Sequence, residues 1–251
     1  METQESGTSA VDSSLGTTIA NVFATPSEAF QGLDTSAPKA MNWVLPMVLM
    51  SVMSILFVYL IFTNETIKTQ IFDMQTQQFD EAVAEGRMTQ QQADQIRDQM
   101  QQTGLGMFMV FGSIPILIFI SAYFFLGALF LWLSAKIVWK SPLKYGKFLE
   151  AYGIATWIGV LGTVITMGMV LGMNSMFATP SAGLLLGDGF DPSNTMHKFA
   201  SAFNIFSVWQ AVVTGIGLSS LAAKPSGNGI VIAVVLWLIW VAIGVPLGLL
   251  R

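Results

Sequence analysis

Five long stretches of this chain carry almost no charge, and this feature constrains the fold more than any other. The stretches are Met41–Phe62, Gly104–Ala135, Ala151–Met173, Phe199–Ala223 and Ile230–Leu250. Each is long enough to cross the hydrocarbon core of a bilayer, which needs roughly 20 helical residues. A charged side chain at the bilayer centre costs about 2.5–3.5 kcal/mol on insertion scales, so lipid excludes charge from such segments. The sequence therefore predicts an all-α, polytopic membrane protein with five transmembrane helices.

The composition supports this class and excludes several others. Only 10% of the residues are charged, whereas a soluble protein carries about 25%. A net charge of −4 argues against a nucleic-acid partner, which would require clustered lysine and arginine. The chain has no cysteine, so disulfides, thiol nucleophiles and cysteine-ligated metals are excluded. We expect one membrane domain, 41–250, with spans at 41–62, 104–135, 148–173, 199–223 and 230–250.

The N-terminal segment divides into two parts. Residues 1–18 are rich in Ser, Thr and Gly without an apolar period, which predicts a disordered tail. Within residues 19–40, Thr25, Pro26 and Glu28 form the pattern of a capping box with proline at the first helical position. An apolar face follows at Phe30 and Leu33. We expect an amphipathic interfacial helix before the first span; a simple linker with a turn is the alternative.

A polar insert, 64–102, separates the first two spans and predicts a helical hairpin outside the membrane. Gly86 is a stop signal for a helix, and Thr89 with Gln92 forms a second capping box. Apolar residues recur at helical spacing on both arms, namely Ile67, Ile71 and Met74, then Ala93, Ile96 and Met100. We place the tip near 85–87. The insert is either a spacer or a partner-binding arm.

Basic residues set the expected orientation. With a cytoplasmic N-terminus, the inner side would carry Lys39, Lys136, Lys140, Lys144, Lys147 and Lys224. The outer side would carry Lys68, Arg87, Arg97, Lys198 and Arg251. The short loops weigh most in this comparison, and the basic loop after the second span is short. We therefore expect a cytoplasmic N-terminus, with the hairpin and the C-terminus extracytoplasmic.

The chain offers little that could perform catalysis, so we expect no enzyme, no catalytic or metal-binding residues and no cofactor. Its one histidine, His197, lies near Asp188 and Asp191, but the spacing matches no metal-ligand motif, and a surface histidine explains it better. Glu150 stands three residues after Lys147 at the start of the third span, which an interfacial i,i+3 pair explains. Gln210, inside the fourth span, predicts an interhelical hydrogen bond.

Small residues are frequent in the last three spans and predict close helix packing. Gly168 and Gly172 form a GxxxG motif in the third span. Such a motif lets two backbones approach closely, either inside one chain or between two copies. Packing within one chain and homo-oligomerisation are both open from the sequence.

Two short segments carry a resemblance to a known family. One is Phe23-Ala24-Thr25-Pro26-Ser27-Glu28-Ala29-Phe30 before the first span, and the other is Ser141-Pro142-Leu143-Lys144-Tyr145-Gly146-Lys147-Phe148 before the third. With five spans and a Gly-rich last pair, the chain resembles the Yip family of five-span membrane proteins, most of all its bacterial branch. The resemblance implies an all-α domain with a cytoplasmic N-terminus and no catalytic residues. Binding of prenylated GTPases, known for eukaryotic members, is not carried over.

These observations lead to two hypotheses about function. The first is a non-enzymatic scaffold that organises membrane lipid or an unidentified protein partner, in a bacterial cytoplasmic (inner) membrane. Its candidate contacts are Phe23, Pro26, Phe30, Lys144, Tyr145 and Lys147, although membrane topology alone also explains the lysines. The second is a small-solute permease, which a water-filled cavity edged by Asn174, Asn204 and Gln210 would favour.

Overall fold

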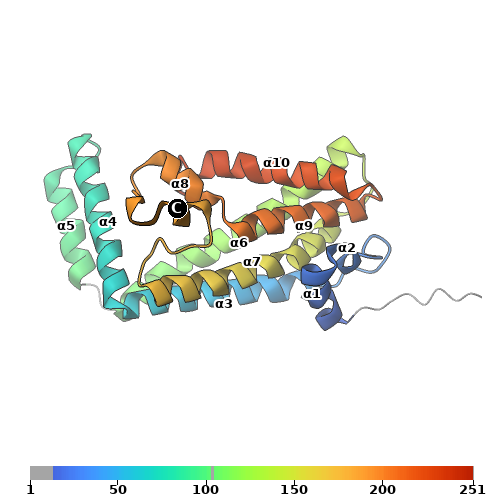
Figure 1. The fold of residues 1–251 in the computed structure, drawn as a ribbon, viewed down its shortest axis with the longest axis horizontal. Coiled ribbons are helices and arrows are strands. Elements are labelled where there is room, and N and C mark those ends of the chain that lie inside the picture. Colours follow the sequence, from blue (N-terminus) through green and yellow to red (C-terminus); the bar gives the residue numbers. More distant parts are fainter. Residues whose placement is uncertain (1–13, 103–104, 251) are drawn as a thin grey trace, which may run out of the picture.

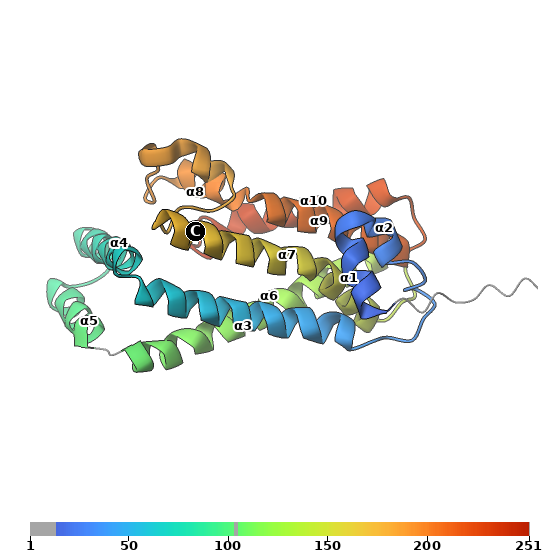
Figure 2. The same ribbon diagram turned by 60° about the horizontal axis from the view of Figure 1, so that its bottom comes forward.

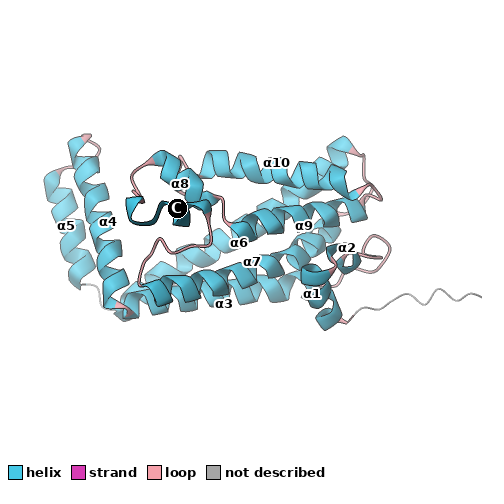
Figure 3. Ribbon diagram, in the orientation of Figure 1, coloured by secondary structure: helices cyan, strands magenta, loops and turns pink. Residues whose placement is uncertain are grey.

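The computed structural model describes residues 14–102 and 105–250, and the elements of this part of the chain are helical (Figure 3). An isolated β-bridge joins Ser181 and Asn204. In chain order the elements are α1 (Leu15–Ala24), α2 (Pro26–Ala29), α3 (Met41–Thr63), α4 (Glu65–Ala84), α5 (Gln90–Gln102), α6 (Leu105–Val138), α7 (Tyr145–Met173), the 3₁₀ helix η1 (Ala182–Gly189), α8 (Thr195–Ala202), α9 (Ile205–Leu221) and α10 (Ser226–Gly244).

Helix α7 lies at the centre of a bundle and packs against α3, α6 and α9, while α10 packs against α9 (Figure 1). Among the described residues, four helices are long and apolar enough to cross a membrane: α3, the 113–138 part of α6, α7 and α10. The 23 residues of α3 extend about 35 Å at 1.5 Å per residue, which exceeds the roughly 30 Å of a hydrocarbon core. Helix α9 is apolar but has only 17 residues.

The two ends of the bundle differ in structure (Figures 1 and 2). Helices α1 and α2, the loop between α6 and α7, and the turn between α9 and α10 lie at one end, which we call the basic end. Helices α4, α5 and α8, with η1 and the described C-terminal residues, lie at the opposite end, which we call the hairpin end. The first and last residues that the structure describes therefore lie at opposite ends of the bundle.

Glycine allows helices to pack closely at two interfaces. The sequence alone does not show which helices meet there. A side chain at Gly153 of α7 would collide with the backbone of Trp43 on α3. A side chain at Gly215 of α9 would collide with the backbone of Ile230 and with the carbonyl oxygen of Gly229 on α10. The last three spans were expected to pack closely through small residues, and the contact of α9 with α10 at Gly215 is of this kind. The contact at Gly153 instead joins the third span to the first.

The fourth apolar stretch, 199–223, is not one continuous helix. Helix α8 ends before Phe203, and the Asn204 side chain accepts a hydrogen bond from Phe206 N at 2.9 Å, which caps α9. The amide of Ile205 donates to the carbonyl oxygen of Pro180 at 3.0 Å. Since asparagine caps a helix more readily than it continues one, the apolar stretch is divided at this residue.

Three further boundaries differ from the sequence prediction. Helix α1 begins at Leu15, within the segment 1–18 predicted as a tail, because Ser14 caps it by accepting from Thr17 N at 3.3 Å; residues 1–13 lie outside the described residues. The capping box at Thr25 does not form, since Thr25 N already donates to Asn21 O. The last span, expected over 230–250, ends as a helix at Gly244, because Pro246 has no N–H to continue it.

Helices α4 and α5 form a hairpin with its turn at Gly86, whose φ of 69° is left-handed. The capping box is present: Thr89 N donates to Gln92 Oε1 at 2.9 Å, and Gln92 N donates to Thr89 Oγ1 at 3.2 Å. Arg97 of α5 joins the two arms by an ion pair with Asp80 of α4 at 2.6 Å, and it also pairs with Asp94 of its own helix at 3.0 Å. Local sequence signals therefore placed this turn correctly.

Candidate functional site

A buried ion pair lies in the first two turns of α7 at the basic end. Lys147 Nζ donates to Glu150 Oε2 at 3.1 Å, and the side chains of the two residues are only 7% and 1% exposed. The sequence predicted this i,i+3 pair as an interfacial one. Its burial follows from the N-terminal segment that covers it.

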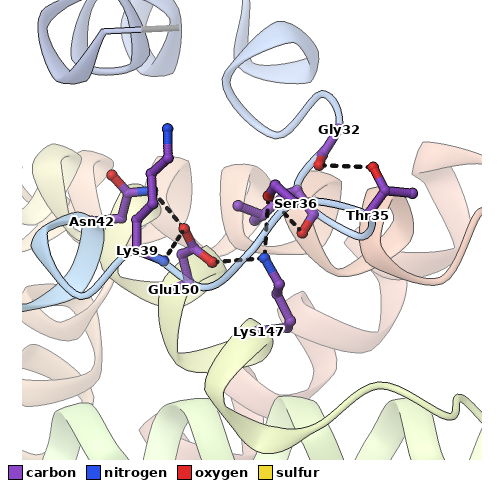
Figure 4. Close-up of polar contacts among 8 residues, drawn as sticks. Gly32, Thr35, Ser36, Lys39, Asn42, Lys147 and Glu150 are labelled. Atoms are coloured by element: carbon purple, nitrogen blue, oxygen red, sulfur yellow. Dashed lines mark hydrogen bonds and ion pairs between the residues drawn. The ribbon is translucent and has the colours of Figure 1, made fainter. Parts of the chain in front are cut away.

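Glu150 also connects α7 to the N-terminal segment that leads into α3 (Figure 4). Its Oε1 accepts from Asn42 Nδ2 at 2.7 Å and from Lys39 N at 3.2 Å. Lys147 Nζ in turn donates to Ser36 Oγ at 3.2 Å. These five residues, Ser36, Lys39, Asn42, Lys147 and Glu150, form what we call the Glu150 network.

The Glu150 network satisfies a carboxylate that would otherwise be costly to bury. A buried charge is tolerated when an opposite charge and further hydrogen bonds compensate for its lost hydration. Both Glu150 oxygens have donors: two from the N-terminal segment and one from Lys147. The network therefore fixes residues 36–42 onto α7. Asn42 and Ser36 were not predicted to take part, and an asparagine one residue inside an apolar span was the available signal for Asn42.

Aromatic residues hold α1 and α2 on the same end of the bundle. Phe30 is fully buried and lies over Gly217 of α9, where a side chain on the glycine would come within 2.7 Å of the ring. Ser220 Oγ donates to Phe30 O at 3.0 Å. Phe23 packs edge-on against Trp209 at a centroid distance of 5.8 Å. Pro26 begins α2 and is half-buried. We call α1, α2 and these contacts the N-terminal platform.

The basic loop residues separate into exposed and internal ones. Lys144 and Lys140 are exposed, as is Lys136, whose Nζ lies 4.6 Å from the centre of the Trp132 ring. Lys147 does not belong to this exposed set, because the Glu150 network occupies its ammonium group. Tyr145 is half-buried, and its hydroxyl donates to Phe125 O at 2.9 Å, which ties the loop to α6.

Gln210 and the glycine motif are placed differently from their predictions. The Gln210 amide makes no hydrogen bond within the described part of the chain; its oxygen lies over Gly159, 2.6 Å from where a Cβ would stand. Gly168 and Gly172 are exposed on α7, and no described atom lies within 4 Å of a Cβ at either. Packing inside one chain therefore does not use this motif, and homo-oligomerisation through it stays a prediction.

A cavity of about 590 Å³ lies between α6, α7, α9 and α10. Gln210, Thr214 and Tyr152 are among its polar lining residues, and the rest of the lining is mainly apolar. Asn174 and Asn204 do not line it. Asn174 instead accepts from Asn64 Nδ2 at 2.8 Å, at the base of the hairpin, and Asn204 caps α9.

His197 lies at the hairpin end and makes a local contact. Its Nδ1 accepts from Asp191 N at 3.0 Å. The hydroxyl and amide of Ser193 both donate to the Asp191 carboxylate, which lowers the pKa of that carboxyl below its ordinary value. Within the described residues, no group of three or more His, Cys, Asp or Glu side chains could hold a metal ion.

The apolar spans and their close packing define an integral membrane protein of the helical-bundle class. Residues 20–247 match the family model of the Yip1 domain. The match covers most of the chain, from within α1 to just beyond the end of α10, and includes the Glu150 network and most of the N-terminal platform. The chain belongs to the Yip1 domain family, as the two short segments indicated. No curated protein and no solved structure matches it significantly.

Proposed function

We propose that this protein is a non-enzymatic membrane scaffold whose basic end binds anionic lipid headgroups and presents the N-terminal platform to a protein partner. The Glu150 network carries the proposal, because it fixes a segment that could otherwise move freely at the membrane surface. Exposed Lys136, Lys140 and Lys144 surround the beginning of α7 and supply positive charge beside the platform. Phe23 and Phe30 serve in this proposal as internal anchors of the platform.

The proposal includes an orientation in which the basic end faces the cytoplasm of a bacterial cell and the hairpin lies outside. It requires five crossings, with α9 as a short fourth one that η1 and α8 extend toward the hairpin end. The positions of α1 at one end and of the described C-terminal residues at the other support an odd number of crossings. The short basic loop after α6 supports a cytoplasmic basic end.

Single cysteines test the orientation in a chain that has no native cysteine. Arg87→Cys at the hairpin tip should react with a membrane-impermeant maleimide in intact cells. Lys144→Cys should react only after the cells are opened, because it would then lie on the cytoplasmic side. Labelling of Lys144→Cys but not Arg87→Cys in intact cells would reverse the orientation.

Neutralising the exposed lysines tests the lipid contact. A double Lys136→Gln, Lys144→Gln variant should lose affinity for phosphatidylglycerol by about tenfold or more, since each lysine near an anionic surface contributes roughly 1 kcal/mol. Native mass spectrometry of the purified protein, titrated with phosphatidylglycerol, would measure the loss. The matched control is Arg87→Gln, Lys198→Gln at the hairpin end. Equal loss in both variants, or none in the first, would contradict the proposal.

The permease hypothesis is less well supported, because most of the polar residues that it required do not line the cavity. Only Gln210 of its three polar residues lines the cavity. Charged side chains are absent from the lining within the described part of the chain, and the mouth is apolar. We therefore prefer the scaffold.

A further inference from the structure

The cavity between α6 and α10 opens toward lipid rather than toward water. Leu126 and Phe130 of α6 and Ile239 and Ile243 of α10 line it, and each of the four is about half exposed. Both helices contain segments able to cross a membrane. An opening between apolar, exposed side chains of two such helices faces the acyl chains of the bilayer. A molecule entering here therefore comes from the membrane.

Two polar side chains that line the cavity, Gln210 and Thr214, make no hydrogen bond within the described part of the chain. Thr214 is only 6% exposed and lines the cavity, yet its hydroxyl makes no hydrogen bond to any described atom. A hydroxyl that faces an apolar cavity without a partner is unfavourable in lipid, where no water replaces the missing bond. The residue is the tenth of the 17 in α9, near the middle of that helix.

The depth of this hydroxyl limits which lipids could satisfy it. Neighbouring Gln210 lies over Gly159, which is the central residue of α7. A phospholipid keeps its charged headgroup and ester groups near the interface, so only its hydrocarbon tail would reach this depth. No charged residue appears among the described residues of the lining to compensate a charged ligand.

We propose that the cavity binds an uncharged membrane lipid, whose apolar chain lies between α6 and α10 and whose hydroxyl or carbonyl group hydrogen-bonds to Thr214. The volume of about 590 Å³ is within the range of small-molecule pockets. This site goes beyond the proposed function, because it needs neither the exposed lysines nor a charged headgroup. Diacylglycerols and isoprenoid quinones share the required chemistry.

Photolabelling in phosphatidylcholine nanodiscs tests the site with three diazirine-bearing probes: hexadecanol, hexadecane and hexadecanoic acid at pH 8. We expect hexadecanol to label peptides of α9 and α10 more strongly than the other two probes. Hexadecane lacks the polar group, and the acid carries a charge that the lining cannot compensate. Equal labelling by all three probes would show only contact with surrounding lipid and would overturn the proposal.

Two substitutions separate specific binding from loss of structure. Thr214→Val removes the hydroxyl while keeping the shape, and it should lower hexadecanol labelling roughly five- to tenfold, the effect of one neutral hydrogen bond. Thr214→Ser keeps the hydroxyl and should retain most of the labelling. Unchanged labelling of Thr214→Val would overturn the proposal.

A third variant blocks the space itself. Ala233 is buried and lines the cavity, so Ala233→Phe should abolish labelling if it melts like the wild type. If that variant does not fold, the comparison of Thr214→Val with Thr214→Ser still tests the proposal. Competition with dioleoylglycerol or a decyl-substituted benzoquinone then identifies the source of the ligand; failure of both to displace hexadecanol would overturn the proposal.

Discussion

The two ends of the bundle each hold a lysine–glutamate pair three residues apart on one helix. Lys147 and Glu150 are 3.1 Å apart at the basic end, and Lys68 and Glu65 are 3.2 Å apart at the hairpin end. The first pair has side-chain exposures of 7% and 1%, whereas the second has 34% and 81%. The same chemistry at the same spacing therefore occurs in opposite environments.

The comparison shows that environment, not distance, determines the role of an ion pair. The exposed pair at the hairpin end gains little, because water already solvates both charges. In the buried pair each charge depends on the other and on the donors of the N-terminal segment. The Glu150 network therefore holds the N-terminal segment against α7, whereas the Glu65–Lys68 pair lies on the surface of one helix.

Removing the buried carboxylate should have the largest effect. Glu150→Leu leaves the Lys147 ammonium buried without its counter-charge and removes the acceptor for Asn42 and Lys39 N. We expect the free energy of unfolding to fall by about 3–5 kcal/mol, as for other broken buried pairs. Denaturant titration in micelles measures this change. The double variant Lys147→Leu, Glu150→Leu should recover much of the loss, and a stable Glu150→Leu single variant would remove the distinction between the two ends.

Changing the exposed pair should have the smallest effect. Glu65→Gln keeps the size of the side chain and removes one charge from the first turn of α4. We expect the free energy of unfolding to fall by about 0.5 kcal/mol or less, the usual value for an exposed helical pair. The same titration provides the measurement. A loss close to that of Glu150→Leu would show that the hairpin end also depends on its ion pair.

Short sequence motifs were sufficient where a turn or cap depends only on contacts between residues a few positions apart. Gly86 with its positive φ and the Thr89–Gln92 box placed the hairpin turn, because both act within a few residues. The same kind of signal failed at Thr25, where the end of α1 had already used the backbone amide. It also failed at Asn204, whose capping role depends on the loop around Pro180 as well as on its own side chain.

The candidate site could be only partly predicted. Lys147 and Glu150 were paired from their spacing, but their burial depends on Asn42 and Lys39, more than a hundred residues earlier in the chain. The cavity at Thr214 was not predicted, because side chains of α6, α7, α9 and α10 line it together. Such contacts join distant segments, and no periodicity within one segment encodes them.

The sequence by itself determined that this is a membrane protein. Lipid excludes charge from any helix that crosses it, and the long stretches without charge show the effect of that exclusion. The sequence also indicated the family, through two short segments, one at the junction of α1 and α2 and one that leads into α7. Tertiary structure alone decided that Lys147 is internal while Lys144 is exposed. These outcomes depend on which helices lie side by side, and burial between helices is a property of the packed bundle rather than of one segment.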